Sequence, residues 1–440
     1  MIDIRGLRED PALVKELLGR RGVEISMVEE LAGLDAAYRE AVSSRDELRS
    51  RVNETSRRVA EAYRNKETAA AERLKEESRR LGAELEALTG QAAELENRRK
   101  DLWLVIPNVP SPDAPIGNGE NDNVVVRYWS PDGGSSAETP KLDYPPYKRV
   151  PHWEIGTQLG ILDLERGAKL SGSMFPLFKG MGSRLIRALT SFALDEHSDS
   201  FLEIRPPTFV KRETMISTGH LPKFADDAYQ MERDDLWAIP TAEVPLTSMA
   251  RDEILDADQL PLKMTAATPC FRREAGSAGR DTRGLLRLHE FDKVELMIYA
   301  TPAQAQEMHA EILSRAENLL RRLGLTYRVL DLCTGDLGAS SRRTFDLEVY
   351  APGVDRWLEV SSVSWFGDYQ ARRANVRYRT EPGGSVEFVH TLNGSALAWA
   401  RVIAAILETG REANGSVALP PVLAPYLRGA SGISAPEAEI

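Results

Sequence analysis

Arginines and glycines are concentrated in one short stretch of this 440-residue chain, between Cys270 and Leu296. The stretch reads CFRREAGSAGRDTRGLLRLHEFDKVEL, and its candidate anion-binding arginines are Arg272, Arg280, Arg283 and Arg287. Planar guanidinium groups present fixed, paired donors that suit phosphate oxygens. The run after the loop is typical of a strand and carries Phe291 and Glu295. Because a flexible loop can fold over a bound anion, the stretch predicts a phosphate-binding site.

Composition alone supports an arginine-rich surface hairpin equally well. The phosphate-binding patterns GxxxxGK[ST] and GxGxxG after a strand do not occur in the sequence. If the chain binds a nucleotide, side chains must therefore hold it. A structural zinc is not expected, because the six histidines are scattered without ligand spacing and the two cysteines, Cys270 and Cys333, lie far apart.

The composition is that of an ordinary globular protein, with 42% hydrophobic and 28% charged residues. Lys and Arg total 56 against 67 Asp and Glu, so the net charge is −11, which excludes a wholly basic nucleic-acid coat protein. The start, MIDIRGLRED, lacks a secretory signal, and the apolar runs are too short to span a membrane. We therefore expect a reduced, cytoplasmic protein.

Residues 27–101 contain no proline and are rich in Glu, Arg, Ala and Leu, which is typical of helix. Heptad columns in the first half are formed by Leu31, Tyr38, Arg45, Val52 and Val59, and by Leu34, Ala41, Leu48, Thr55 and Ala62. The second half has a column of Leu74, Leu81, Leu88, Leu95 and Leu102. The polar segment 62–68 predicts a turn, and hence an antiparallel helical hairpin about 50 Å long. A dimerisation coiled coil is the alternative.

Arginines gather near the turn of this hairpin, where they could meet the phosphates of a nucleic acid. A solvated charged face is the alternative, because glutamates such as Glu61 and Glu72 are interleaved with them. The candidate nucleic-acid contacts are Arg57, Arg58, Arg64, Arg73, Arg79 and Arg80.

The rest of the chain differs in composition from the hairpin. Residues 108–140 are rich in Pro, Gly, Asn and Ser and predict a linker. Residues 141–428 mix helical patterns with strands that alternate charged and apolar residues, as one-sided antiparallel sheets do. We expect a helical-hairpin domain over 1–107, an α+β domain with a mainly antiparallel sheet flanked by helices over 141–428, and a flexible tail over 429–440.

Several motifs resemble those of class II aminoacyl-tRNA synthetases, specifically the seryl-tRNA synthetase family. Residues 271–296 resemble the family's motif 2, VHTLNGSALAWARVIAAILE (389–408) its motif 3, and FLEIRPPTFV (201–210) its motif 1. Other segments, including IPTAEVPLT (239–247), follow in the family's order, and the resemblance extends to about Arg428. It implies a class II catalytic domain with an N-terminal tRNA-binding helical arm.

The resemblance implies an ATP-dependent ligase that acts in two steps. The carboxylate of L-serine attacks the α-phosphate of ATP with loss of pyrophosphate, and the seryl group then passes to the terminal adenosine of tRNA(Ser), with tRNA(Sec) as a further candidate. The first step builds up negative charge around phosphorus, so catalysis should rest on cations and on alignment of the reactants. The resemblance also implies Mg²⁺, a homodimer built on motif 1, and no membrane partner.

The resemblance also implies roles for individual residues. Arg272 would hold the α-phosphate and the substrate carboxylate, Arg401 the γ-phosphate, and Glu359 with Ser362 a magnesium ion. The implied catalytic residues are Arg272, Arg401 and Glu359. The implied ATP ligands are Arg272, Glu274, Phe291, Glu359, Ser362 and Arg401, with Glu274 and Phe291 at the adenine. The implied serine ligands are Thr241, Glu243, Arg272, Glu295, Asn393 and Ser395.

The sequence departs from the family pattern at Arg273, Trp365 and Trp399, which bears on how strictly the substrate is selected. Two alternative functions are a specialised paralogue that supplies seryl-tRNA to a biosynthetic pathway and a non-catalytic RNA-binding relative. The presence of both Arg272 and Arg401 favours an active enzyme.

Overall fold

The chain divides into two units, one formed by residues Ile2–Pro107 and the other by Met1 together with residues Asn108–Ile440. The computed structural model describes residues 1–276 and 281–434. Arg280, one of the candidate loop arginines, and the last six residues of the predicted tail lie outside the described residues.

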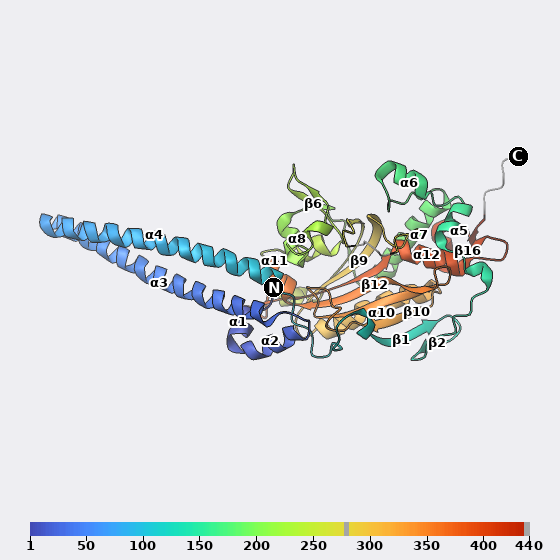
Figure 1. The fold of residues 1–440 in the computed structure, drawn as a ribbon, viewed down its shortest axis with the longest axis horizontal. Helices are drawn as coiled ribbons and strands as arrows, with labels where there is room; N and C mark the ends of the chain where they lie inside the picture. The colour runs from blue at the N-terminus through green and yellow to red at the C-terminus, as the bar shows by residue number, and fades with distance from the viewer. Residues whose placement is uncertain (277–280, 435–440) are drawn as a thin grey trace. The chain divides into compact units, whose positions relative to one another are not determined.

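The N-terminal unit is helical and consists of α1 (Ile4–Glu9), α2 (Pro11–Gly19), α3 (Ile25–Arg64) and α4 (Thr68–Val105). α3 and α4 lie side by side as the predicted antiparallel hairpin (Figure 1), and the turn is confined to 65–67. At a rise of 1.5 Å per residue, the 40 residues of α3 span about 60 Å.

The heptad positions of the two helices meet inside the hairpin. The buried side chains are Leu31, Leu34, Ala41, Leu48, Thr55 and Ala62 of α3, and Ala71, Leu81 and Ala92 of α4. The polar interruption at Arg45 is half-buried and pairs with Asp46 at 2.9 Å. Because each apolar seam is covered within the same chain, the structure favours the hairpin over a dimerisation coiled coil.

A buried carboxylate joins the helices at the base of the hairpin. The Asp35 side chain of α3, which is 2% exposed, accepts hydrogen bonds from Arg8 Nε at 2.7 Å, Arg99 Nη1 at 3.0 Å and Arg39 Nε at 3.2 Å. Burial alone would raise the pKa of Asp35, but the hydrogen bonds from Arg8 and Arg99 lower it below its usual value. This carboxylate therefore links α1, α3 and α4.

We expect Asp35→Ala to destabilise the helical unit by about 1.5–3 kcal/mol, because it removes the buried carboxylate to which Arg8, Arg39 and Arg99 donate hydrogen bonds. Hydrogen exchange of the α3 and α4 amides, measured by mass spectrometry in the full chain, would report the loss. Asp46→Ala is the matched control, since Asp46 is an exposed carboxylate on the same helix and its loss should cost about 0.5 kcal/mol or less. Equal exchange rates in the two variants would contradict the prediction.

Nine strands of the described residues form the sheet at the centre of the second unit. Their order is β2 (Gly134–Ser136), β1 (Val124–Ser130), β10 (Tyr327–Asp331), β11 (Arg343–Ala351), β12 (Arg356–Gly367), β15 (His390–Ala398), β9 (Glu290–Ala300), β8 (Leu262–Phe271) and β3 (Leu202–Glu203). Neighbouring strands are antiparallel apart from β3 and β8, which are parallel. The expected α+β fold with a mainly antiparallel sheet is therefore confirmed.

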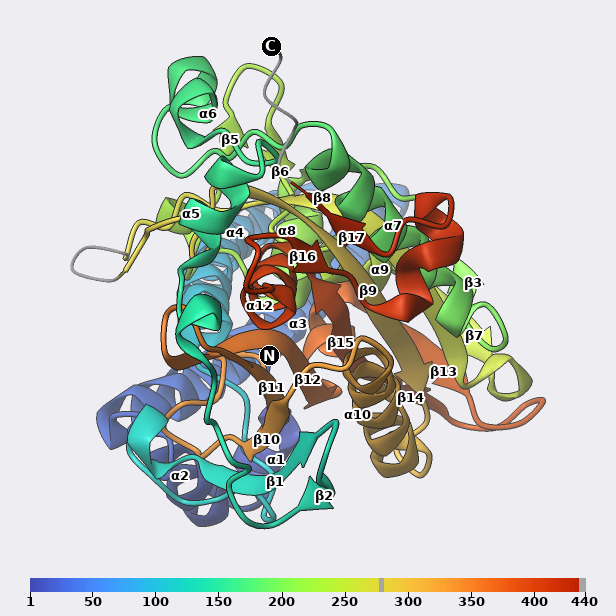
Figure 2. The ribbon, with the colours of Figure 1, turned by 90° about the vertical axis from the view of Figure 1, so that its right-hand side faces the viewer.

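Long amphipathic helices cover this sheet: α7 (Met181–His197), α10 (Ala305–Arg322) and α12 (Trp399–Gly410). Leu189, Ile312 and Ile403 of these helices join Val294 and Val363 of the strands in one apolar core. Figure 2 shows α10 and α12 beside β15. Among the described helices, none combines the length and the apolar character needed to cross a membrane.

Shorter elements surround the sheet. The helices are α5 (His152–Gln158), α6 (Leu164–Ser171), α8 (Arg212–Thr218), α9 (Glu243–Thr247) and α11 (Tyr369–Ala374). Smaller sheets are formed by β4 (Phe209–Lys211), β6 (Leu236–Ala238) and β5 (Gln230–Met231), by β14 (Val386–Phe388), β13 (Arg377–Arg379) and β7 (Ile254–Asp256), and by β16 (Val417–Ala418) with β17 (Gly432–Ile433).

Two expected segments are more regular than predicted. Residues 108–140, predicted to be a linker, contain β1 and β2, and β1 pairs with β10 in the main sheet. The linker prediction is wrong there because the run VVVRYWS, which is β-branched and aromatic, forms a strand despite the surrounding Pro and Gly. In the predicted tail 429–440, β17 pairs with β16 and buries Ile433 in the core, so the flexible tail does not begin at 429.

Candidate active site

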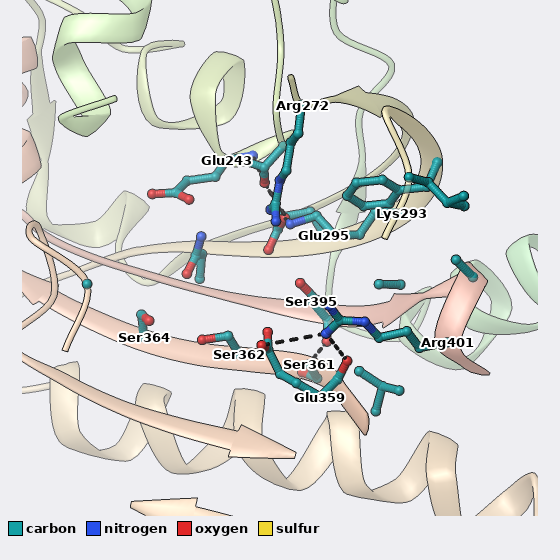
Figure 3. A pocket seen from close by; sticks show the side chains of 18 of the residues that line it. Glu243, Arg272, Lys293, Glu295, Glu359, Ser361, Ser362, Ser364, Ser395 and Arg401 are labelled. Atoms are coloured by element: carbon teal, nitrogen blue, oxygen red, sulfur yellow. Dashed lines mark hydrogen bonds and ion pairs between the residues drawn. The ribbon is translucent and has the colours of Figure 1, made fainter. Parts of the chain in front are cut away.

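The residues predicted to bind serine, ATP and magnesium line the same cavity of the second unit, about 480 Å³ in volume. They are Thr241, Glu243, Arg272, Glu274, Phe291, Glu295, Glu359, Ser362, Asn393, Ser395 and Arg401. Figure 3 shows Arg272 and Arg401 reaching the cavity from different elements, with Glu243 and Glu295 on the side of Arg272 and Glu359 beside Arg401. Two guanidinium groups far apart in the sequence therefore face a common space.

Alternation along β9 and β15 aims side chains into this cavity. Residues two apart on a strand share a face, and Phe291, Lys293 and Glu295 of β9 all line the cavity. Ser395 of β15 pairs directly with Glu295, and Asn393 lies two residues before it. The antiparallel pairing of two strands thus collects these polar groups on one wall.

A β-bulge in β12 supplies the opposite wall. Glu359 and Ser362 are three residues apart, so a regular strand would point them to opposite faces, yet both line the cavity. Glu348 of β11 pairs with Glu359 and Leu347 pairs with Ser361, which leaves Val360 without a partner on β11. The Val360 side chain is buried in the apolar core. The extra residue therefore brings Glu359 and Ser362 to the same side.

At one end of the cavity, a buried cation lies between polar groups. Lys293 Nζ donates a hydrogen bond to Thr241 Oγ1 at 2.8 Å and forms an ion pair with Glu295, and Thr241 Oγ1 donates to Glu295 Oε2 at 2.6 Å. Sequence reasoning missed Lys293. The period of two between Phe291 and Glu295 is the signal that could have found it.

Glu243, at the start of α9, is the second carboxylate at this end. Burial, and then the negative charge of Glu295, raise the pKa of Glu243 to about 7. A hydrogen bond from Gln370 Nε2 to Glu243 Oε1, 2.6 Å long, acts in the opposite direction. The two carboxylates place negative charge where a substrate ammonium group could be held.

His220 is a further cavity residue that sequence reasoning did not single out. Its Nδ1 lies 2.7 Å from Thr218 Oγ1. Burial, and then the charge of Arg272, lower the pKa of His220 to about 3. The imidazole is therefore neutral near pH 7 and adds no third cation to this wall.

Arg272 and Phe291 form the middle of the cavity. The Arg272 guanidinium carbon lies 5.3 Å from the Phe291 ring centroid, which is cation–π range. The carboxylate of Glu274, predicted to contact adenine, accepts a hydrogen bond from Arg287 Nη1 at 2.9 Å. Arg287 therefore also belongs to the cavity wall.

Arg401 is held at the other end by main-chain oxygens. Its Nε donates to the carbonyl of Leu286 at 3.1 Å, and its Nη1 donates to the carbonyl of Glu359 at 2.8 Å. The Glu359 carboxylate lies 3.7 Å from the same Nη1. These contacts orient the guanidinium and leave part of it facing the cavity.

A buried histidine anchors the loop that carries Leu286. His152 Nε2 accepts a hydrogen bond from Leu285 N–H at 2.9 Å, so its Nδ1 carries the proton and donates to Glu408 Oε1 at 2.7 Å. Glu408 lies on α12, the helix that also carries Arg401. Gly284 permits this approach, since a Cβ there would lie 2.5 Å from His152 Nε2. The motif-2 loop and α12 are thereby joined.

A hydroxyl and a second carboxylate, those of Ser362 and Asp346, lie in the part of the sheet that carries Glu359. Asp346 of β11 pairs with Ser362 in the sheet, and its Oδ1 is buried without a hydrogen-bond partner among the described atoms. Burial and the charge of Glu359 hold the pKa of Asp346 well above its usual range, whereas a cation would favour the ionised form. Within residues 1–276 and 281–434, no three His, Cys, Asp or Glu side chains come together as a metal site. Glu359, Ser362 and Asp346 offer the hard oxygen donors that suit a magnesium ion.

These three departures from the family pattern lie outside the cavity wall. Arg273, Trp365 and Trp399 are not among the described residues that line the cavity. Arg273 packs over the ring of Tyr229, Trp365 lies against Arg342, and Trp399 is buried in the apolar core. These substitutions act on the surroundings of the cavity rather than on its wall.

Two family models match the chain. Residues 225–410 match the tRNA synthetase class II core domain (G, H, P, S and T), and residues 1–110 match the seryl-tRNA synthetase N-terminal domain. The serine–tRNA ligase of Herpetosiphon aurantiacus is 46% identical over 98% of this chain and 99% of its own length. That of Pseudothermotoga lettingae is 45% identical over 97% of this chain and 99% of its own length.

Solved structures show the same likeness. The seryl-tRNA synthetase of Pyrococcus horikoshii complexed with ATP has a TM-score of 0.90 at 36% identity and covers 99% of this chain and 100% of its own. The cytoplasmic serine-tRNA ligase of Naegleria fowleri in complex with AMP has a TM-score of 0.82 at 28% identity and covers 97% of this chain and 96% of its own. The resemblance carried by the motifs is thus confirmed along nearly the whole chain, which belongs to the seryl-tRNA synthetase family.

Proposed function

We propose that the chain activates L-serine with ATP to form seryl-adenylate and pyrophosphate, and then transfers the seryl group to the 3′-terminal adenosine of tRNA(Ser). The observation that carries this proposal is that Arg272 and Arg401 line the same cavity as Glu243 and Glu295. The nearly full-length relatives named serine–tRNA ligases support the same activity. The structural relatives complexed with ATP and AMP support nucleotide binding in this cavity.

Serine is recognised at the end of the cavity that holds the acidic pair. Glu243 and Glu295 bind the ammonium group, and Arg272 binds the carboxylate. Thr241, Asn393 and Ser395 supply the polar groups that a hydroxyl can satisfy. Alanine would leave such buried groups unpaired, and this type of site can reject an analogue that lacks the hydroxyl by about 10⁴–10⁵.

ATP binds on the side of Arg272, Phe291 and Arg401, with Phe291 stacking on the adenine. Arg272 stabilises charge on the α-phosphate as the serine carboxylate attacks, and Arg401 holds the γ-phosphate, so that pyrophosphate is aligned as the leaving group. No side chain needs to transfer a proton in this step. Glu359, Ser362 and Asp346 would hold Mg²⁺, which when bound neutralises phosphate charge.

The second step requires tRNA, and we assign its recognition outside the cavity to the helical unit. Arg57, Arg58, Arg64, Arg73, Arg79 and Arg80 are all exposed near the turn of the hairpin, where phosphates of tRNA(Ser), and of tRNA(Sec) as a second candidate, would meet them. The protein would act in the cytoplasm, where these substrates occur.

A homodimer is proposed at the β3 edge of the sheet, within motif 1. β3 is short, and Leu202 in it is 60% exposed, as expected of an edge that another copy covers. Sedimentation velocity of the purified chain would give a mass near twice 48.8 kDa.

Pyrophosphate exchange into ATP tests the activity directly. Exchange should occur with serine and be weak or absent with threonine, alanine and cysteine. Exchange with another amino acid but not with serine would refute the proposed substrate. Transfer to tRNA(Ser) is measured separately, as acid-precipitable labelled serine.

The pKa of Glu243 predicts a pH dependence of serine binding. Below pH 7 this carboxyl group is largely protonated and cannot attract the ammonium group, so the KM for serine should fall about tenfold between pH 6 and pH 8. The KM for ATP, measured in the same exchange assay, is the internal control. A serine KM that is equal at the two pH values would contradict this role of Glu243.

A further inference from the structure

Gln370 is a fully buried side chain behind the acidic end of the cavity. It lies on α11 and is not among the described residues that line the cavity. Its Nε2 donates hydrogen bonds to Glu243 Oε1 at 2.6 Å and to the carbonyl of Thr218 at 3.4 Å, and its Oε1 accepts one from Thr391 Oγ1 at 2.7 Å. One amide group thereby joins α8, α9, α11 and β15.

These contacts fix which way the amide points. Thr391 is fully buried, and its hydroxyl donates to the carbonyl end of Gln370. The NH₂ end then faces Glu243, whose ionised carboxylate can accept a hydrogen bond but cannot donate one. A flipped amide would turn its carbonyl oxygen toward the Glu243 carboxylate and lose that hydrogen bond, so the contact with Glu243 fixes the orientation.

We propose that Gln370 is a positioning residue, whose amide aims one oxygen of Glu243 and thereby sets how tightly the cavity holds the ammonium group of the amino acid. This inference rests on the proposed function, since it concerns the serine end of the same cavity. Gln370 touches neither the cavity nor a reacting atom and acts through Glu243.

The surroundings of Glu243 give the amide its effect. Burial and the charge of Glu295 oppose ionisation of Glu243, while Gln370, Lys293 and Asn393 favour it. Lys293 already forms an ion pair with Glu295 and a hydrogen bond with Thr241. Gln370 is therefore the stronger of two hydrogen-bond donors to Glu243, the other being Asn393, and its loss moves the pKa of Glu243 upward.

Gln370→Met tests the proposal, because methionine has a similar volume and no donor. At pH 7 we expect the KM for serine in pyrophosphate exchange to rise about tenfold or more, from the loss of a hydrogen bond to a charged group. The KM for ATP should change less than about twofold. The pH at which serine binding weakens should move upward, which a change in packing alone would not produce.

Thr391→Val provides a second, milder variant, since it removes the hydroxyl that orients the amide but keeps the shape. It should raise the KM for serine in the same direction, and Thr391→Ser should restore it. If Gln370→Met fails to fold, this pair carries the test. Gln259→Met is the matched control, because Gln259 is an exposed glutamine outside the cavity wall whose side chain caps a short turn.

The outcomes separate this inference from the proposed function. An unmodified chain without serine-dependent exchange would refute the proposed function. Serine-dependent exchange in the unmodified chain, with the same serine KM and the same pH dependence in Gln370→Met, would overturn the role of Gln370 alone. An equal rise in the KM for serine and for ATP would also overturn it, because a general loss of structure does not distinguish the two substrates.

Discussion

Replacing Arg401 with alanine is expected to lower serine-dependent pyrophosphate exchange by about 10³-fold or more, the range seen when an arginine that stabilises a phosphoryl transition state is removed. Arg401 faces the cavity while main-chain oxygens of Leu286 and Glu359 hold it in place. The protein itself thus holds the guanidinium in place, and the alanine variant loses this oriented charge. Single-turnover formation of seryl-adenylate in the absence of tRNA measures the effect.

Two controls make this prediction specific. Arg401→Lys keeps the charge but loses the planar fork, so its rate should lie between those of the alanine variant and the unmodified chain. Arg411→Ala removes an arginine that follows α12 and is not among the described cavity residues, and it should leave exchange within about twofold. Equal rates for Arg401→Ala and Arg411→Ala would remove Arg401 from the catalytic machinery.

Shortening the helical arm is expected to separate the two half-reactions. Because α3 and α4 are antiparallel, deletion of residues 46–83 and closure with a short turn removes matched portions of both helices. Adenylate formation should stay within about twofold, because the cavity lies in the other unit. Charging of tRNA(Ser) should fall about a hundredfold or more in kcat/KM, because the arginines that we propose contact the tRNA phosphates are lost.

A full-length variant tests the charge without changing the length of the arm. Replacing Arg57, Arg58, Arg64, Arg73, Arg79 and Arg80 with glutamine should weaken tRNA charging and flatten its dependence on salt concentration. Replacing exposed glutamates of the same helices, such as Glu61 and Glu72, with glutamine is the matched control. Normal charging of tRNA by the shortened chain would show that the arm has no part in recognition.

Sequence patterns predicted most of the fold, because the hydrophobic period and the composition of a segment indicate its secondary structure. The heptads between Leu31 and Leu102 located the hairpin to within a few residues of its ends. The prediction failed for β1. The Pro and Gly residues on either side of Val124–Ser130 indicated a linker, although the segment itself is rich in β-branched residues. Pairing with β10, a strand about 200 residues later, decides that segment, and such a distant partner is not visible in a local pattern.

The motif residues of the candidate site could be predicted from the sequence. The buried residues that hold them in place could not. Arg272, Glu295 and Arg401 fall in motifs, and the structure brings them into the same cavity, while their roles stay predictions. Gln370 and His152 were missed because their hydrogen-bond partners are distant in sequence. A single sequence gives the type of each polar residue, but it does not show which distant group becomes its hydrogen-bond partner in the folded protein.

The bulge in β12 also has a consequence for folding. Leu358 and Val360 face the core on one side of it and Val363 on the other, so the apolar residues change from even to odd positions within the strand. If β12 slipped by one residue along β11, serine hydroxyls would enter the core and valines would enter the cavity. The phase change thus penalises misaligned pairings, and the native alignment of the sheet is also the one that places Glu359 and Ser362 together on the cavity wall.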